Sequence, residues 1–290
     1  MVAARCNLHT GYMTKLRDGI TVAIPAHNEA STIGSVVERL RSYLESTSEW
    51  VAEILVVDDR STDDTAAVAI SAGASVVRTN DVCSTSSGSA GKGDAIWAAV
   101  HQCDTNLIGF IDADLDELDP EKYMELFRHL RDNPDVQLTK GTLTRVRDGQ
   151  PSGPGRVTAL TAKPLLSLLR PDMSSLRDPL SGLFATRTES IGALWLDCDY
   201  GVDVGVVLDI ADRYGPEAVV EIEIGRIAHR RRPLDQLSLT AEQVARAIIA
   251  RSYESRIPSD DLLRRRPPAL AARRRANFLH LRHRQRLQAI

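Results

Sequence analysis

The sequence predicts an α/β fold built on a mixed, mainly parallel sheet, and two observations support this prediction. Short runs rich in β-branched and aliphatic residues alternate with helix-compatible stretches in the first part of the chain, an order typical of βαβ units. Aromatic residues make up 4% of the 290 residues, against 43% hydrophobic residues in total, so aliphatic side chains must fill the core. Strands rich in such residues are typical of parallel sheets with helices on both faces. We therefore expect a Rossmann-like sheet flanked by helices.

The expected elements follow one another in a regular order. Strands are expected at residues 21–25, 53–57, 75–77 and 107–111. Helix-compatible stretches lie at residues 31–46, 63–72 and 92–102. Further helices are expected around Val207 and Val244, where apolar residues recur at helical spacing. Between these two groups, the segment 142–156 (TLTRVRDGQPSGPGR) is rich in Gly, Pro, Ser and charge, which predicts a loop or a subdomain boundary.

Composition argues against several classes of protein. The net charge of −3 gives no global reason to expect nucleic-acid or membrane binding. No run of about 18 apolar residues is present to span a bilayer, and the start of the chain lacks the apolar core of a signal peptide. The four cysteines form no CxxC pair, which argues against a zinc site or a disulfide framework. We therefore expect a cytoplasmic protein.

The end of the chain is strongly basic. Arginines crowd the segment after Ser252, and few aromatic residues are interleaved with them. We interpret residues 256–290 as a basic helical tail, either a solvated helix or a subunit-contact arm of a homodimer, in preference to a nucleic-acid or lipid-binding arm.

Polar residues end three of the expected strands. The sequence AHNE follows the first strand, Asp58 and Asp59 follow the second, and the DAD sequence follows the fourth. Ligands of parallel α/β sheets bind beyond the carboxyl ends of the strands, so these groups should share one rim. Asp58 is placed to accept hydrogen bonds from a base or ribose. Downstream, Ser61 or Thr62 should cap the next helix, with Asp63 and Asp64 complementing its dipole.

The stretch IGFIDADLDELDP, residues 108–120, divides into two parts. Asp112 and Asp114 stand on alternate residues just past a buried strand, where both can reach one hard cation such as Mg²⁺ or Mn²⁺. The carboxylates that follow are better interpreted as the turn and the acidic start of a helix whose first position suits Pro120.

A lysine between two glycines opens the next candidate helix. The sequence SAGKGDAIWAAV places Lys92 where backbone N–H groups and an ammonium can face one anion. Its spacing differs from GxxxxGK[ST], so we expect a diphosphate held with a metal and not a P-loop. A glycine-rich turn with a surface lysine is the alternative.

Several of these motifs together resemble the GT-A glycosyltransferases. VAIPAHNEASTIGSVV, ILVVDDRSTDDT, AGKGDAIW and GFIDADLD occur in the order found in that family. More narrowly, the chain resembles the retaining glucosyl-3-phosphoglycerate synthases of actinobacteria through GRVTALTAKPLLSLLRP, YGVDVGVVLDIADRYG and RIAHRRRPLDQL. The resemblance covers about residues 20–250.

The resemblance implies a function and a set of site residues. It implies metal-dependent, retaining transfer of a hexose, most simply glucose from UDP-glucose, to a small phosphorylated or anionic acceptor such as 3-phosphoglycerate. It implies nucleotide-sugar contacts from Pro25, Ala26, Glu29, Asp58, Lys92 and Asp112. It implies acceptor contacts from Arg156, Thr158 and Arg231. It implies that Asp114 and His229 bind Mg²⁺ or Mn²⁺. It also implies catalytic roles for Asp203, Lys92 and Tyr200.

It also implies a division of the chain. Residues 1–140 would form the half that binds the nucleotide sugar. Residues 141–255 would form the half of the same domain that binds the acceptor and completes the metal site.

The chain departs from the family pattern mainly on the acceptor side. Asp203 stands where the synthases carry Glu, Arg231 where they carry Asn, and Ser181-Gly182-Leu183 where they carry Gly-Gly-Glu. Asp58-Asp59 replaces their Asp-Ser. A GT-A enzyme with a different, pathway-specific acceptor is therefore the first alternative, and a sugar nucleotidyltransferase or a non-catalytic sugar-nucleotide-binding protein is the second.

Overall fold

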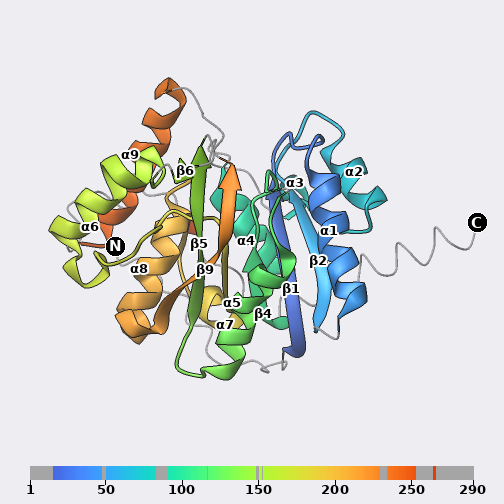
Figure 1. The fold of residues 1–290 in the computed structure, drawn as a ribbon, viewed down its shortest axis with the longest axis horizontal. Helices are drawn as coiled ribbons and strands as arrows, with labels where there is room; N and C mark the ends of the chain where they lie inside the picture. The colour runs from blue at the N-terminus through green and yellow to red at the C-terminus, as the bar shows by residue number, and fades with distance from the viewer. Residues whose placement is uncertain are drawn as a thin grey trace, which may run out of the picture.

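The structure is a computed structural model that describes residues 16–47, 50–82, 91–115, 117–147, 150–151, 153–228, 234–252 and 264–265. Within these ranges an eight-stranded sheet runs through the molecule in the order β3-β2-β1-β4-β7-β5-β6, with β9 also pairing with β5 (Figure 1). Its strands are β1 (Arg17–Ala26), β2 (Val51–Asp58), β3 (Ser75–Arg78), β4 (Thr105–Phe110), β5 (Leu138–Arg147), β6 (Gln150–Pro151), β7 (Phe184–Arg187) and β9 (Val219–Ala228).

Most pairs in the sheet are parallel. Strand β1 runs parallel to both β2 and β4, and β2 runs parallel to β3. Strand β7 is antiparallel to its neighbours β4 and β5, and β5 runs parallel to β9. The prediction of a mixed, mainly parallel sheet is confirmed, and the parallel strands end at a common rim.

Helices cover both faces of this sheet. They are α1 (Ile33–Ser46), α2 (Thr65–Ser71), α3 (Thr79–Val82), α4 (Lys92–Gln102), α5 (Pro120–Asp132), α6 (Lys163–Leu169), α7 (Thr188–Gly192), α8 (Val202–Tyr214) and α9 (Leu234–Ala250). Short helical turns lie at η1 (Thr158–Ala162), η2 (Pro171–Met173) and η3 (Pro216–Ala218). Apart from the main sheet, β8 (Leu196–Asp197) pairs with β10 (Arg264–Arg265).

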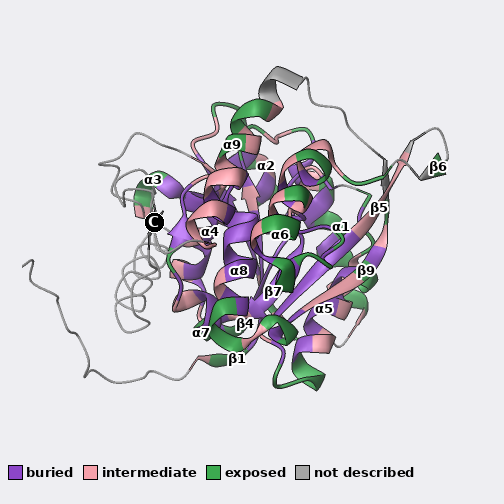
Figure 2. Cartoon of the chain, turned by 90° about the vertical axis from the view of Figure 1, so that its left-hand side faces the viewer, coloured by how far each residue is buried: buried purple, intermediate pink, exposed green. Residues whose placement is uncertain are grey.

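Burial follows the alternation of side chains along the central strand. Val22 and Ile24 of β1 pack with α1 and α5, whereas Ala23 belongs to the core on the other face, with α4 and α8. Successive strand residues point to opposite faces, so a central strand covered on both sides must be apolar throughout. Figure 2 shows the resulting buried layer at the sheet and the inner helix faces, with exposed residues outside.

Two local predictions were wrong. The loop expected from residue 142 begins later, because TLTRV alternates β-branched and aliphatic residues and pairs with β9. Neither Ser61 nor Thr62 caps α2. An Asp63 carboxylate oxygen accepts from the backbone N–H of Thr65 at 3.1 Å, while Ser61 accepts from Asn28 N–H.

The predicted helix start after the acidic turn is confirmed. Helix α5 begins at Pro120, and the carboxylate of Asp119 accepts from Glu121 N–H at 3.0 Å as its cap. Cys103 and Cys198 are buried free thiols. Within the described ranges no helix combines the length and apolarity needed to cross a bilayer. Of the basic tail the structure describes Arg264 and Arg265, whose backbone is a strand and not the predicted helix.

Candidate active site

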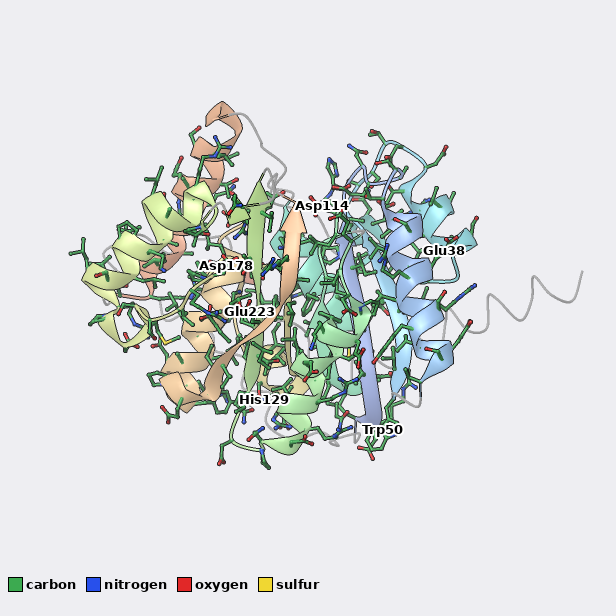
Figure 3. The ribbon with its side chains drawn as sticks, viewed as in Figure 1. Glu38, Trp50, Asp114, His129, Asp178 and Glu223 are labelled. Carbon is green, nitrogen blue, oxygen red and sulfur yellow. The ribbon has the colours of Figure 1, made fainter. Side chains whose placement is uncertain are left out.

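A cavity of about 880 Å³ opens at the carboxyl rim of the parallel strands. Its wall combines the ends of β1 and β4, the start of α4, the end of β5 with the Gly155–Thr158 segment, and the turn before β7. Tyr200 and Asp203 at the start of α8 and side chains of α9 complete it. In Figure 3 Asp114 lies at this rim, whereas Trp50 and His129 lie at the opposite end of the sheet.

The cavity gathers most of the site residues expected from the sequence. Those in its wall are Pro25, Ala26, Glu29, Lys92, Asp112, Asp114, Arg156, Thr158, Tyr200 and Asp203. His229 and Arg231 lie outside the described residues.

Asp58 is placed differently from its neighbour. Its carboxylate accepts from Ser61 N–H at 3.1 Å and lies 3.7 Å from the guanidinium of Arg78, and Asp58 is not part of the cavity wall. Asp59 does line the cavity, where it pairs with Arg60 at 2.6 Å. Burial raises the pKa of Asp59, although a hydrogen bond from Thr79 opposes the rise. Asp59 therefore lies in the cavity wall, whereas Asp58 contacts the following loop through Ser61 N–H.

The centre of the cavity holds a bridged pair of carboxylates. The Lys92 ammonium donates to Asp112 at 2.8 Å and to Asp203 at 3.0 Å. Burial alone would lower the pKa of Lys92, but the two carboxylates outweigh burial and raise it, so the ammonium stays charged. Lys92 thus joins the end of β4 to the start of α8.

Asp203 is the most deeply placed of these groups. Its side chain is 7% exposed, and burial raises its pKa, with Lys92 and then Lys140 opposing the rise. One oxygen binds Lys92, whereas the buried Oδ1 has no hydrogen-bond partner among the described residues. A buried acceptor without a partner is costly, so a donor from a bound ligand would satisfy it.

Glycines allow the close approaches around Lys92. A Cβ at Gly93 would lie 1.8 Å from the carbonyl oxygen of Asp197, and one at Gly182 would lie 2.2 Å from Oδ1 of Asp112. The first glycine lets α4 pack against the 197–198 backbone, whose Cys198 carbonyl accepts from Asp94 N–H at 3.2 Å. The second lets the turn before β7 touch the carboxylate that Lys92 binds.

Basic residues line another part of the same cavity wall. Arg145, near the end of β5, pairs with the buried carboxylate of Asp178 at 2.9 Å, and Thr158 donates to the same carboxylate at 3.4 Å. Arg156 lies between them in sequence and lines the same wall. Thr158 begins a π-helical turn, a feature often found at functional sites. Arginines and a hydroxyl arranged in this way suit an anion.

Sequence reasoning missed Arg145 and Asp178. The loop prediction covers Arg145, although the alternation in TLTRV is a usable sign of a strand. Asp178 gives no local signal, because it reaches the cavity through a turn fixed by Glu221 of β9, which accepts from the backbone N–H groups of Arg177 and Asp178 at 2.7 and 2.9 Å.

Known proteins are similar to this chain in both sequence and architecture. The profile of glycosyl transferase family 2 matches residues 21–164. Glucosyl-3-phosphoglycerate synthase of Mycolicibacterium smegmatis is 35% identical over 236 residues, which cover 80% of this chain and 77% of that protein. The chain belongs to the glucosyl-3-phosphoglycerate synthase family. It is therefore a glycosyltransferase.

Solved structures of a family member share the fold of this chain. The Mycobacterium tuberculosis synthase with Mn²⁺, UDP-glucose and phosphoglyceric acid superimposes with a TM-score of 0.73 at 35% identity, covering 81% of this chain and 80% of that one. A complex of the same enzyme with Mn²⁺, UDP-glucose and glycerol 3-phosphate gives the same TM-score at 34% identity and the same coverage. Membership of the family removes the nucleotidyltransferase and the non-catalytic binding protein as alternatives.

The rim is suited to the divalent cation expected in this family. Asp114 follows β4 in the cavity wall, and β9 ends at Ala228, which pairs with Val146 of β5. Within the described ranges no cluster of three or more His, Cys, Asp or Glu side chains surrounds a common point. The Asp114 carboxylate in the wall of this cavity suits a hard cation that takes further oxygen ligands from phosphates.

Proposed function

We propose that this chain transfers glucose from UDP-glucose to a hydroxyl of a small phosphorylated acceptor such as 3-phosphoglycerate, with retention of anomeric configuration. The observation that carries the proposal is the Lys92 bridge, which stands between a nucleotide-side rim and an arginine-rich wall in one cavity. Complexes of the Mycobacterium tuberculosis synthase with UDP-glucose and either phosphoglyceric acid or glycerol 3-phosphate support it, because both of these small ligands carry a phosphate.

The donor lies along the strand ends in this proposal. Pro25, Ala26 and Glu29 face the uridine, and Asp58 orders the loop behind it through Ser61. Asp112 contacts the nucleotide and Lys92 the diphosphate. One UDP-glucose molecule can contact both side chains, because Lys92 Nζ and Asp112 Oδ1 are 2.8 Å apart.

The diphosphate must leave with its negative charge stabilised. Asp114 and His229 would hold Mg²⁺ or Mn²⁺, which when bound acts as a Lewis acid on the diphosphate oxygens. Lys92 adds a fixed positive charge on the same group, in a site where that charge requires no reorganisation. Asp203 and Tyr200 orient the transferred sugar and the acceptor hydroxyl. The unpartnered Oδ1 of Asp203 accepts a hydrogen bond from one of them.

The acceptor phosphate lies against Arg156 and Thr158, with Arg145 in the same wall and Arg231 as a further contact. A guanidinium forks onto phosphate oxygens and a hydroxyl adds a single donor. Asp178 supplies a buried carboxylate to this wall. It lies a few residues before Leu183, which stands where the family pattern has an acidic residue. This Asp178 carboxylate is the observation that favours the alternative acceptor, a phosphorylated hydroxy compound without a second anionic group.

We also propose a cytoplasmic homodimer. The buried free thiols Cys103 and Cys198 suit a reducing compartment. The exposed leucines Leu160, Leu168 and Leu239 on the η1–α6 segment and α9 offer apolar surface for a subunit contact. Light scattering coupled to size-exclusion chromatography tests the dimer, and a mass of one chain at micromolar concentration would contradict it.

Turnover with a defined panel tests the reaction. The purified chain is incubated with MnCl₂, UDP-glucose and either 3-phosphoglycerate, glycerol 3-phosphate or glycerol, and products are followed by mass spectrometry. We expect a hexose mass gain on the phosphorylated acceptors, lost in excess EDTA and in Asp114→Ala. Asp135→Ala, at an exposed turn, is the matched control. Transfer to glycerol alone, or full turnover in EDTA, would contradict the proposal.

A further inference from the structure

Lys140 is a fully buried lysine in β5 that lies behind the cavity wall. Its relative exposure is 0%, and it is among the largest side chains buried in the molecule. Its ammonium donates to the backbone carbonyl of Ser181 at 2.8 Å and to that of Asp203 at 3.2 Å, and it lies 5.5 Å from the ring centroid of Phe184. Two carbonyl oxygens and an aromatic face therefore surround the three N–H donors.

This environment is unusual for a buried charge. Among the described residues no carboxylate forms an ion pair or hydrogen bond with Lys140, although buried ammonium groups are normally paired. Burial lowers its pKa, and Asp203 and then Asp178 oppose that change. An apolar side chain of similar volume often stabilises a core as well as a buried charge does. Stability alone therefore does not account for a lysine here.

The two carbonyls belong to elements that carry the reacting groups. Ser181 precedes Gly182, whose backbone touches the Asp112 carboxylate. Asp203 binds Lys92, and Lys92 binds Asp112. Contacts therefore form a closed ring from Lys140 through the 181–182 turn, Asp112, Lys92 and Asp203 back to Lys140.

We propose that Lys140 is a positioning residue for glycosyl transfer: its ammonium ties the Ser181–Gly182 turn to the first turn of α8 and so holds Asp203 in register with Lys92. Lys140 does not line the cavity. It acts through the backbone of two residues that do line it. This role rests on the proposed function, because it requires that glycosyl transfer takes place in the cavity. It does not depend on which acceptor is used.

A double-mutant cycle tests this proposal in the full chain. Lys140→Met, Asp203→Ala and the double variant are assayed for kcat and for the KM of UDP-glucose and of the acceptor. UDP binding with MnCl₂ is measured by calorimetry, and Tm is recorded. Lys122→Met, an exposed lysine on α5, is the control. If Lys140→Met does not fold, Lys140→Gln keeps a hydrogen-bond donor of similar length and removes the charge.

We expect Lys140→Met to lower kcat at least tenfold while the dissociation constant of UDP changes less than twofold. The double variant should be no slower than Asp203→Ala, because residues that act as one unit are not additive. A kcat within twofold of the unmodified chain, or losses that multiply in the double variant, would overturn the proposal. Absence of hexose transfer in the unmodified chain would instead contradict the proposed function, so the two failures are distinguishable.

Discussion

Lys92 and Asp203 meet at 3.0 Å in the centre of the cavity, although they are 111 residues apart in the sequence. Their contact joins the start of α4 to the start of α8, and Lys92 also holds Asp112 at 2.8 Å. The ammonium is thus the point at which the nucleotide side and the acceptor side of the cavity are connected. Its removal should affect the chemical step more than the binding of either substrate.

Lys92→Met should lower kcat by about 10²–10³-fold, the range seen when one preorganised group that stabilises transition-state charge is removed. The KM for UDP-glucose should rise much less, because Pro25, Ala26 and Glu29 remain in the wall. Steady-state kinetics at saturating MnCl₂ measure both values. Lys163→Met on α6, outside the cavity wall, is the control. A variant with normal kcat and raised KM alone would contradict a role in the reaction.

Activity should fall on the acid side at a pH above the usual range of an aspartate. Burial raises the pKa of Asp203 above 3.8, so it takes up a proton, and loses its charge toward Lys92 and Lys140, before an exposed aspartate would. A carboxyl with a raised pKa binds its proton more tightly in the folded than in the unfolded chain. Protonation of Asp203 therefore favours the fold as pH falls, and the loss of activity should precede unfolding.

The measurement is kcat/KM against pH for the unmodified chain and Asp203→Asn, with circular dichroism at each pH. Asp203→Asn should be slower and should lack this acid limb. An identical limb in both proteins would assign it to another group.

Local sequence patterns indicated some residues of the cavity wall and missed others, and the reason is topological. Asp112, Asp114 and Lys92 follow local patterns, a strand end and a glycine-flanked helix start, which place them on the rim of any parallel sheet. Lys140 and Arg145 acquire their roles only because antiparallel β7 enters between β4 and β5. No local pattern specifies that insertion.

The same contrast explains the smaller errors. The loop expected over residues 142–156 is indicated by glycines and prolines that cluster at its end, while its first residues pair with a strand that comes some 80 residues later. Ser61 was predicted to cap α2, but β1 and β2 are adjacent and parallel, so Ser61 accepts instead from Asn28 N–H after β1. In both cases a long-range partner outweighed a local preference.

Gly182→Ala should weaken donor binding while the fold is retained. Its Cβ would lie 2.2 Å from Oδ1 and 2.3 Å from Oδ2 of Asp112, so the carboxylate must turn away from Lys92. We expect a rise of about tenfold in the dissociation constant of UDP with MnCl₂, equivalent to about 1.4 kcal/mol, measured by calorimetry. Gly34→Ala in α1, where the added methyl meets only Val68, is the control. Unchanged UDP binding would show that Asp112 does not need its present position.

Arg145 and Asp178 should set the acceptor specificity. Arg145→Gln removes a charged donor from the anion-binding wall, and hydrogen bonds to charged groups contribute about 1.5–3 kcal/mol. Steady-state kinetics should therefore show that the KM of a phosphorylated acceptor rises about 10- to 100-fold, by the same conversion of free energy to affinity, while that of UDP-glucose stays constant. Arg177→Gln controls for the loss of one positive charge, because its half-exposed guanidinium pairs with Glu223 and does not line the cavity.

Asp178→Asn should have the opposite effect on acceptor binding. It removes the carboxylate that pairs with Arg145 at 2.9 Å and leaves the wall more positive. Because phosphoglycerate carries a carboxylate besides its phosphate, it should gain more affinity from this change than glycerol 3-phosphate does, which the same kinetics would record as a larger fall in KM. Equal effects on both acceptors would show that Asp178 only holds Arg145 and Thr158 in place and does not select against a second anion.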